Sequence, residues 1–215
     1  MIILFIITIL LLIVQISLAL IGFNATDKLK KKYSKPLGSQ ITPEKMLSQN
    51  EKKFSKVTIK VSENLDDVAS LQDQLVLINK SDLSKNTLYI NYKFLYYFYL
   101  ALNKNRYIRD YKIYQNVIFG VQIFFLVLGS IFFGLIVNTY LIASLVLQLF
   151  LFVFCIYNYF RVSTFAEEVF TTNKKILDLD KVEEARIESL IADISLMPFE
   201  YPFEFVFKFA QFIKP

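Results

Sequence analysis

The sequence contains no histidine and no tryptophan, and it has a single cysteine, Cys155. Without histidine the chain cannot build a Ser-His-Asp triad, an imidazole general base or a His-ligated zinc site. One cysteine excludes an internal disulfide bond and a multi-cysteine metal site. These absences remove the commonest catalytic and metal-binding chemistries. No catalytic, metal-binding or cofactor-binding residue is therefore predicted, and no cofactor is expected.

Charged side chains are absent from the forty-four residues between Val117 and Phe160. About 20 apolar residues already span the ~30 Å hydrocarbon core of a bilayer, so this run is long enough for two crossings. A single long buried helix would need a larger core than 215 residues can build. The polar pair Asn138-Thr139 divides the run. The pattern predicts a transmembrane helical hairpin with spans at Val117–Val137 and Tyr140–Phe160.

A second apolar segment, Met1–Phe23, is interrupted only by Thr8, Gln15 and Ser17. It lacks the basic leader and the small-residue cleavage site of a secretory signal peptide, so it is predicted to be an uncleaved membrane anchor. Five lysines follow it: Lys28, Lys30, Lys31, Lys32 and Lys35. Because basic loops stay in the cytoplasm, the protein is predicted to be a multi-pass protein of the cell membrane. Its N-terminus lies outside and its main module lies in the cytoplasm.

The lysine cluster also has a second interpretation, as a surface for anionic lipid, to which each residue would contribute ~1 kcal/mol near the membrane. Topology alone is the favoured interpretation. Nucleic-acid binding is not predicted, because the lysines adjoin the bilayer and have no interleaved aromatic residues. Basic residues exceed acidic ones by eight between Asn24 and Gln115, whereas acidic residues exceed basic ones by three between Arg161 and Pro215.

Residues 24–115 are predicted to form a small basic cytoplasmic α+β module. Thr42-Pro43-Glu44 has the pattern of a helix N-terminus, with a capping hydroxyl, a proline in the first helical position and an acid in the first turn. Apolar alternation and short apolar runs predict the strands Val57–Val61, Leu75–Ile78 and Thr87–Asn91. The aromatic segment Phe94–Leu102 is predicted to be helical.

The C-terminal part is predicted to contain a charged cytoplasmic helix at 161–190, followed by an amphipathic helix at 191–215. The second helix would carry one polar stripe formed by Asp193, Glu200, Glu204, Lys208 and Gln211. It is either an interfacial helix or a fourth transmembrane span. With the anchor at 1–23 and the hairpin at 116–160, the fold class is an α+β membrane protein. It has three or four transmembrane or interfacial helices and a small cytoplasmic α+β module.

Small and polar residues inside the predicted spans have local interpretations. Ser130 and Gly134, four residues apart, would let another helix approach closely, although chance occurrence in an apolar run is slightly favoured. Gln148 is predicted to hydrogen-bond across the hairpin and is given no transport role. The absence of charge from the first three spans argues against an ion or proton pathway.

The order of features resembles a known family. The anchor is followed by Lys32-Tyr-Ser-Lys35 and Gly38-Ser-Gln-Ile-Thr-Pro-Glu44, and then by Val57-Thr-Ile-Lys-Val61 with Asn64-Leu-Asp-Asp67. Leu88-Tyr-Ile90, two spans, an acidic helix and a last apolar helix complete the series. This organisation resembles that of the YugP-type membrane-bound neutral zinc metallopeptidases of bacteria.

In that family the chemistry depends on an H-E-x-x-H motif in a helix before the hairpin. The resemblance aligns Leu102-Asn-Lys-Asn-Arg106 with the motif, so that Leu102 and Arg106 replace the zinc-binding histidines and Asn103 replaces the general base. The family's acid after the hairpin would correspond to Glu168 or Glu167. Leucine, arginine and asparagine cannot perform those roles. The resemblance therefore implies a degenerate member, a pseudoenzyme without metal or catalysis.

Three functions follow from the sequence. The leading prediction is a non-catalytic integral membrane protein that binds or scaffolds a membrane or cytoplasmic partner protein. The alternative is an active membrane peptidase or hydrolase with an unusual Asp, Glu, Lys and Ser set. The third is a small transporter or channel subunit that uses the polar stripe.

A carboxylate site formed by Asp66 and Asp67 with Asp73 or Asp82 is less favoured than a solvated loop. The bilayer is a predicted partner, and the oligomeric state is left open.

Overall fold

The computed structural model describes residues 2–63, 69–72, 75–102, 106–131 and 135–204. The chain is mostly helical and divides into two compact units. The helical unit comprises the described residues of 1–26, 110–161 and 195–215, and the α/β unit comprises those of 27–109 and 162–194. The predicted basic module and most of the charged segment that follows the hairpin thus belong to one folded unit.

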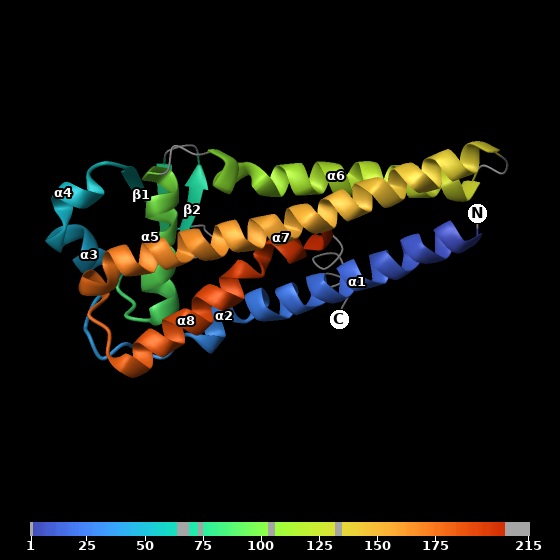
Figure 1. Cartoon of the computed structure of the whole chain (residues 1–215). Coiled ribbons are helices and arrows are strands. Elements are labelled where there is room, and N and C mark those ends of the chain that lie inside the picture. Colours follow the sequence, from blue (N-terminus) through green and yellow to red (C-terminus); the bar gives the residue numbers. More distant parts are fainter. Residues whose placement is uncertain (1, 64–68, 73–74, 103–105, 132–134, 205–215) are drawn as a thin grey trace. The chain divides into compact units, whose positions relative to one another are not determined.

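Three long apolar helices dominate the chain (Figure 1): α1 (Ile2–Asp27), α6 (Arg106–Ile131) and α7 (Leu135–Leu177). Their segments Ile2–Thr26, Asp110–Gly129 and Asn138–Leu177 are long and apolar enough to cross a membrane. The prediction of an apolar N-terminal helix followed by two further apolar helices is confirmed. Most residues in the apolar windows of these segments are not buried within the protein, which is compatible with membrane-spanning helices.

The predicted turn between the second and third apolar helices is wrong. Asn138 and Thr139 lie inside α7, whereas α6 ends at Ile131 and α7 begins at Leu135. Asparagine and threonine lower helix propensity only slightly and keep their backbone N–H donors, so an isolated pair does not end a helix. The two helices come close at Gly129, where an added Cβ would lie 3.0 Å from the Leu141 side chain.

The α/β unit contains a three-stranded sheet formed by β1 (Thr58–Ser62), β2 (Ala69–Gln72) and β3 (Leu75–Asn79). The strand order is β1-β3-β2, with β1 parallel and β2 antiparallel to β3. Helix α5 (Leu88–Leu102) packs against β2 and β3. The strands predicted at Val57–Val61 and Leu75–Ile78 are confirmed, and so is the helix predicted at Phe94–Leu102.

The strand predicted at Thr87–Asn91 is wrong, because Leu88–Asn91 form the first turn of α5 and Thr87 directly precedes it. The Thr87 hydroxyl accepts a bond from the Ile90 amide at 3.4 Å, and the Asn91 amide donates to the Thr87 carbonyl at 3.1 Å. All five residues from Leu88 to Tyr92 are buried. A helix enclosed on every side shows no 3.6-residue polarity pattern, so its β-branched and aromatic residues resembled a strand.

The remaining elements of the α/β unit are short: α2 (Leu29–Lys32), α3 (Pro43–Gln49), α4 (Glu51–Phe54) and the 3-10 turn η1 (Lys80–Asp82). The predicted cap of α3 is confirmed, since the Lys45 amide donates to the Thr42 hydroxyl at 3.2 Å. The core contains three packed rings, with Phe54 4.6 Å from Phe98 and 5.3 Å from Phe94 between centroids. This cluster fastens α4 to α5.

The segments predicted as single helices after the hairpin are interrupted. Helix α7 continues to Leu177 and ends where Asp178 adopts a left-handed conformation (φ 48°), which aspartate tolerates better than most residues. Helix α8 (Lys181–Ser195) follows, and then come α9 (Met197–Glu200) and the 3-10 turn η2 (Tyr201–Phe203). Residues 191–204 of the amphipathic helix predicted for 191–215 are thus divided among the end of α8, α9 and η2, and the new elements begin near Pro198 and Pro202. The remaining residues of the predicted helix, including Lys208 and Gln211, lie outside the described residues.

Candidate functional site

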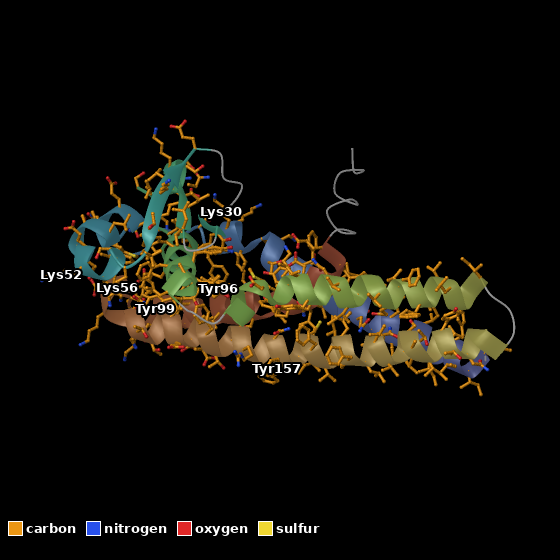
Figure 2. The ribbon with its side chains drawn as sticks, turned by 90° about the horizontal axis from the view of Figure 1, so that it is seen from above. Lys30, Lys52, Lys56, Tyr96, Tyr99 and Tyr157 are labelled. Carbon is orange, nitrogen blue, oxygen red and sulfur yellow. The ribbon has the colours of Figure 1, made fainter. Side chains whose placement is uncertain are left out.

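Helix α5 presents an aromatic face to the part of α7 that belongs to the α/β unit (Figures 1 and 2). Tyr92 and Tyr96 are four residues apart and therefore lie on one side of α5. The Tyr92 hydroxyl donates to the Ala166 carbonyl at 2.7 Å, and the Tyr96 ring centroid is 5.2 Å from that of Phe165. At this tyrosine pair, the helix before the apolar hairpin contacts the C-terminal part of α7, beyond its uncharged segment.

Burial raises the pKa of Tyr92 well above its usual value of 10.0, with smaller contributions from Tyr96 and the Glu167 carboxylate. Burial also raises the pKa of Tyr96. Both phenols therefore remain protonated at neutral pH. A protonated phenol donates a hydrogen bond but does not serve as a general base or as an anionic metal ligand. In this state the pair contributes packing and one buried hydrogen bond.

Lys93 lies between the two tyrosines in sequence and is itself buried, with 5% of its surface exposed. Its ammonium nitrogen is 5.6 Å from the Tyr89 ring centroid and 5.4 Å from that of Tyr97. Aromatic faces stabilise a cation at such distances, which offsets part of the cost of removing it from water. Nothing in the residue types of 88–102 except the i,i+4 spacing of Tyr92 and Tyr96 could have indicated this site.

No family model, curated protein or solved structure matches the chain. Within the described ranges, no group of three acidic or cysteine side chains is arranged to hold a metal ion.

The residues to which the sequence assigned a peptidase-like role are only partly described. Leu102 is the last residue of α5, and residues 103–105 lie outside the described residues. Glu167 and Glu168 are exposed on α7, where the Ser163 hydroxyl donates to Glu167 at 3.4 Å. The part of α7 directly before these acids contacts the tyrosine pair of α5, through Ala166 and Phe165.

Asp82 is the one described member of the suggested carboxylate site, since Asp66, Asp67 and Asp73 lie outside the described residues. Its side chain is completely buried and accepts bonds from the ammonium groups of Lys85 at 2.6 Å and Lys30 at 3.0 Å. Burial alone would raise the pKa of Asp82, but the bonds from Lys85 and Lys30 hold it below the ordinary 3.8. Asp82 thus fixes the segment after α1 to η1.

The lysine cluster after α1 is divided between structural and exposed residues. Lys32 donates to Asp193 of α8 at 2.6 Å, and the Tyr33 hydroxyl donates to the same carboxylate at 2.8 Å. Burial, with help from the bond to Asp193, raises the pKa of Tyr33 to about 12, so this donor keeps its proton at neutral pH. Leu29 is also buried. The segment is therefore built into the α/β unit rather than left as a free tail.

Polar side chains in the helical unit make contacts that the sequence did not predict. Gln148 of α7 donates to the Gln15 amide oxygen at 3.4 Å, and Gln15 donates to the Gln148 carbonyl at 3.0 Å. Gln148 therefore bonds to α1 rather than across the hairpin, which corrects the sequence prediction. Gln115 of α6 donates to the Cys155 sulfur at 3.1 Å and to the Pro198 carbonyl at 3.0 Å. Gly134 and the side chain of Ser130 lie outside the described residues.

The acids of the predicted polar stripe belong to different contacts. Asp193 binds Lys32 and Tyr33 in the α/β unit, whereas Glu200 accepts a bond from the Thr26 hydroxyl in the helical unit at 2.5 Å. Glu204 forms an ion pair with Lys112. Each described acid of the stripe is thus engaged with a side chain of the protein.

Proposed function

We propose that the chain is a non-catalytic integral membrane protein that holds a folded cytoplasmic unit at the bilayer, where that unit binds a partner protein. The observation that carries this proposal is the construction of the segment after α1. Lys30 and Lys32 pair with Asp82 and Asp193. An apolar helix long enough to span a membrane is therefore followed directly in sequence, from Asp27 on, by residues that belong to a folded unit. Such construction suits a protein whose task is to position a binding surface.

The orientation follows from charge. The positive-inside rule puts the lysines after α1, and with them the α/β unit, in the cytoplasm of the cell. The chain enters or leaves that unit at 26/27, 109/110, 161/162 and 194/195. The apolar helices α6 and α7 can therefore leave and return as one hairpin, so all the entries to the unit lie on the same side of the membrane.

We further propose that the chain is a pseudo-peptidase related to the metallopeptidases that its organisation resembles. Tyr92-Lys-Phe-Leu-Tyr96 has the i,i+4 spacing of the family's two metal ligands and contacts α7 next to Glu167. This placement differs by ten residues from Leu102–Arg106, the one that the sequence alone suggested. Two protonated tyrosines and a lysine would then stand where the family has two histidines and a glutamate. They cannot bind zinc or activate a water molecule.

The catalytic part of this proposal predicts that the purified full-length protein contains far less than one zinc per chain and does not cleave casein. The physical reason is the lack of neutral imidazole and anionic ligands at the tyrosine pair. Metal content would be measured by elemental analysis, and cleavage by release of labelled peptide before and after addition of zinc. Stoichiometric zinc with proteolysis that a chelator abolishes would instead support the alternative, an active membrane peptidase.

The proposed membrane orientation predicts that cysteines introduced into a Cys155→Ala variant react from only one side of the membrane, depending on their position. Lys56→Cys, on the exposed surface after α4, should react with a membrane-impermeant thiol crosslinker only after the cells are permeabilised. Ile2→Cys, at the exposed start of α1, should react in intact cells. After permeabilisation, Lys56→Cys should attach to one discrete second chain. Reaction of Lys56→Cys from outside would overturn the orientation, and a lack of any attached chain from several exposed α/β positions would overturn partner binding.

A further inference from the structure

The five lysines after α1 perform two different tasks. Lys30 and Lys32 form ion pairs with Asp82 and Asp193 within the α/β unit. The other three, Lys28, Lys31 and Lys35, are exposed, and no described residue accepts a bond from their ammonium groups. A charge cluster that served only to set topology would not need this division. The three exposed side chains are called the lysine triad below.

The backbone holds the lysine triad in a defined arrangement. Leu29 and Tyr33 are buried in the same segment, and α2 covers Leu29–Lys32. Lys28 directly precedes α2, Lys31 lies within it, and Lys35 follows three residues after its end. Because buried neighbours and the pairs of Lys30 and Lys32 hold the backbone of this segment, the three exposed lysines belong to a folded part of the chain rather than to a free tail.

The triad also lies next to the point where α1 reaches the end of its apolar segment at Thr26. A helical rise of ~1.5 Å per residue puts Lys28 roughly 3 Å and Lys31 roughly 8 Å further along the chain. Both distances lie within the ~10 Å over which charges interact at 0.1 M salt. Lysine ammonium groups bind phosphate as compact point charges with three rotatable donors, so they suit headgroups of varied structure.

We propose that Lys28, Lys31 and Lys35 form a binding surface for the phosphate groups of anionic lipids at the cytoplasmic face of the membrane. This inference rests on the membrane insertion of α1 that the proposed function contains. The triad recruits anionic lipid around the end of α1 and keeps the α/β unit against a negatively charged headgroup layer. Lys28 contributes most and Lys35 least, because attraction to the surface charge decreases with distance.

The test compares two triple variants of the full-length protein, each of which loses three positive charges. The first is Lys28→Gln, Lys31→Gln and Lys35→Gln. The matched control is Lys52→Gln, Lys56→Gln and Lys60→Gln, which removes exposed lysines of α4, its following turn and β1. Lys52 and Lys56 lie at a different end of the α/β unit from Lys30 (Figure 2). Both variants change only exposed side chains, and circular dichroism would verify that each one folds.

The measurement is the selectivity of the reconstituted protein for spin-labelled phosphatidylglycerol over spin-labelled phosphatidylcholine, obtained from the fraction of motionally restricted lipid. The wild type should prefer the anionic lipid, and 1 M salt should weaken that preference. The triad variant should lose roughly five-fold or more of the selectivity, the amount expected when lysines near an anionic surface are neutralised. The control variant should keep it.

The remaining outcomes overturn the inference in distinguishable ways. If the triad variant retains selectivity, or the control loses as much, the lysine triad is not the lipid surface. If the triad variant keeps lipid selectivity but no longer attaches the second chain in the crosslinking experiment, the triad binds protein. If neither lipid is motionally restricted by the wild type, the chain is not embedded in the membrane and the proposed function fails with the inference.

Discussion

Replacing Asp82 with alanine is expected to lower the free energy of unfolding of the α/β unit by about 2–3 kcal/mol. Asp82 is fully buried and accepts a bond from each of two ammonium groups, Lys30 and Lys85. A hydrogen bond to a charged group contributes ~1.5–3 kcal/mol. The sum is reduced here because both lysines are about half exposed and can return to water. Urea denaturation in mild detergent, followed by hydrogen exchange of the α2 and η1 amides, measures the loss.

Glu63→Gln is the matched control for this prediction, because Glu63 accepts a bond from Lys80 at the same 2.6 Å but both side chains are exposed. It should change stability little, since exposed ion pairs contribute little.

The lowered pKa of Asp82 predicts a second effect, on the pH dependence of stability. Its contribution is complete above pH 3.8, the ordinary value, and is lost as the pH falls further through the folded-state pKa. Asp82→Ala should remove that part of the acid sensitivity; equal acid sensitivity in the variant would contradict the assignment.

The Asp82 contacts also illustrate what the sequence could not provide. Lys30 and Asp82 are separated by 52 positions, and nothing in the local pattern of either segment indicates a buried partner. The sequence placed Lys30 in a cluster with two interpretations, topology or lipid binding. Only the fold separates Lys30 and Lys32, which pair with the buried Asp82 and the partly buried Asp193, from the three lysines that face solvent. Long-range pairing of charged residues is a tertiary property, so composition and spacing do not reveal it.

Features determined by local chemistry were predicted more successfully. The Thr42 cap, the apolar helix after the N-terminus and the strand near Val57–Val61 depend on side chains within a few residues of one another. The error at Thr87–Asn91 has the opposite origin, because burial on all sides of α5 removed the polarity pattern that distinguishes helix from strand. The error at Asn138-Thr139 arose because polarity was taken to mark a turn, whereas helix interiors accept both residues.

The tyrosine pair lies between these cases. The i,i+4 spacing of Tyr92 and Tyr96 is visible in the sequence, but α5 contains so many aromatic residues that this pair has no special status there. Its significance comes from the contacts with Ala166 and Phe165, more than sixty residues later. The contact between α5 and α7 therefore depends on the fold and could not be predicted from the spacing of the two tyrosines alone.

Replacing Glu183 with alanine is expected to lower the free energy of unfolding of the α/β unit by about 2 kcal/mol. One carboxylate oxygen of Glu183 accepts from the Gly38 amide at 2.7 Å, and the other accepts from the Asp180 amide at 3.1 Å. The Glu183 amide in turn donates to the Asp180 carboxylate at 2.7 Å, which completes a capping box at the start of α8. Loss of such a cap costs ~1 kcal/mol, and loss of the hydrogen bond to the Gly38 amide costs a further ~0.5–1.5 kcal/mol.

Loss of the Glu183 carboxylate should also affect residues outside α8. Gly38 follows the lysine-rich segment in sequence, and its amide donates to Glu183. Hydrogen exchange should therefore accelerate at Gly38 as well as in the first turn of α8 in Glu183→Ala. Glu183→Gln, which keeps one oxygen acceptor of the same size, should lose less stability. Glu184→Ala is the matched control, since the neighbouring acid binds only Lys174 among the described residues, at 2.9 Å near the surface. Acceleration confined to α8 would show that Gly38 is held by other contacts and that the two segments are not coupled through this carboxylate.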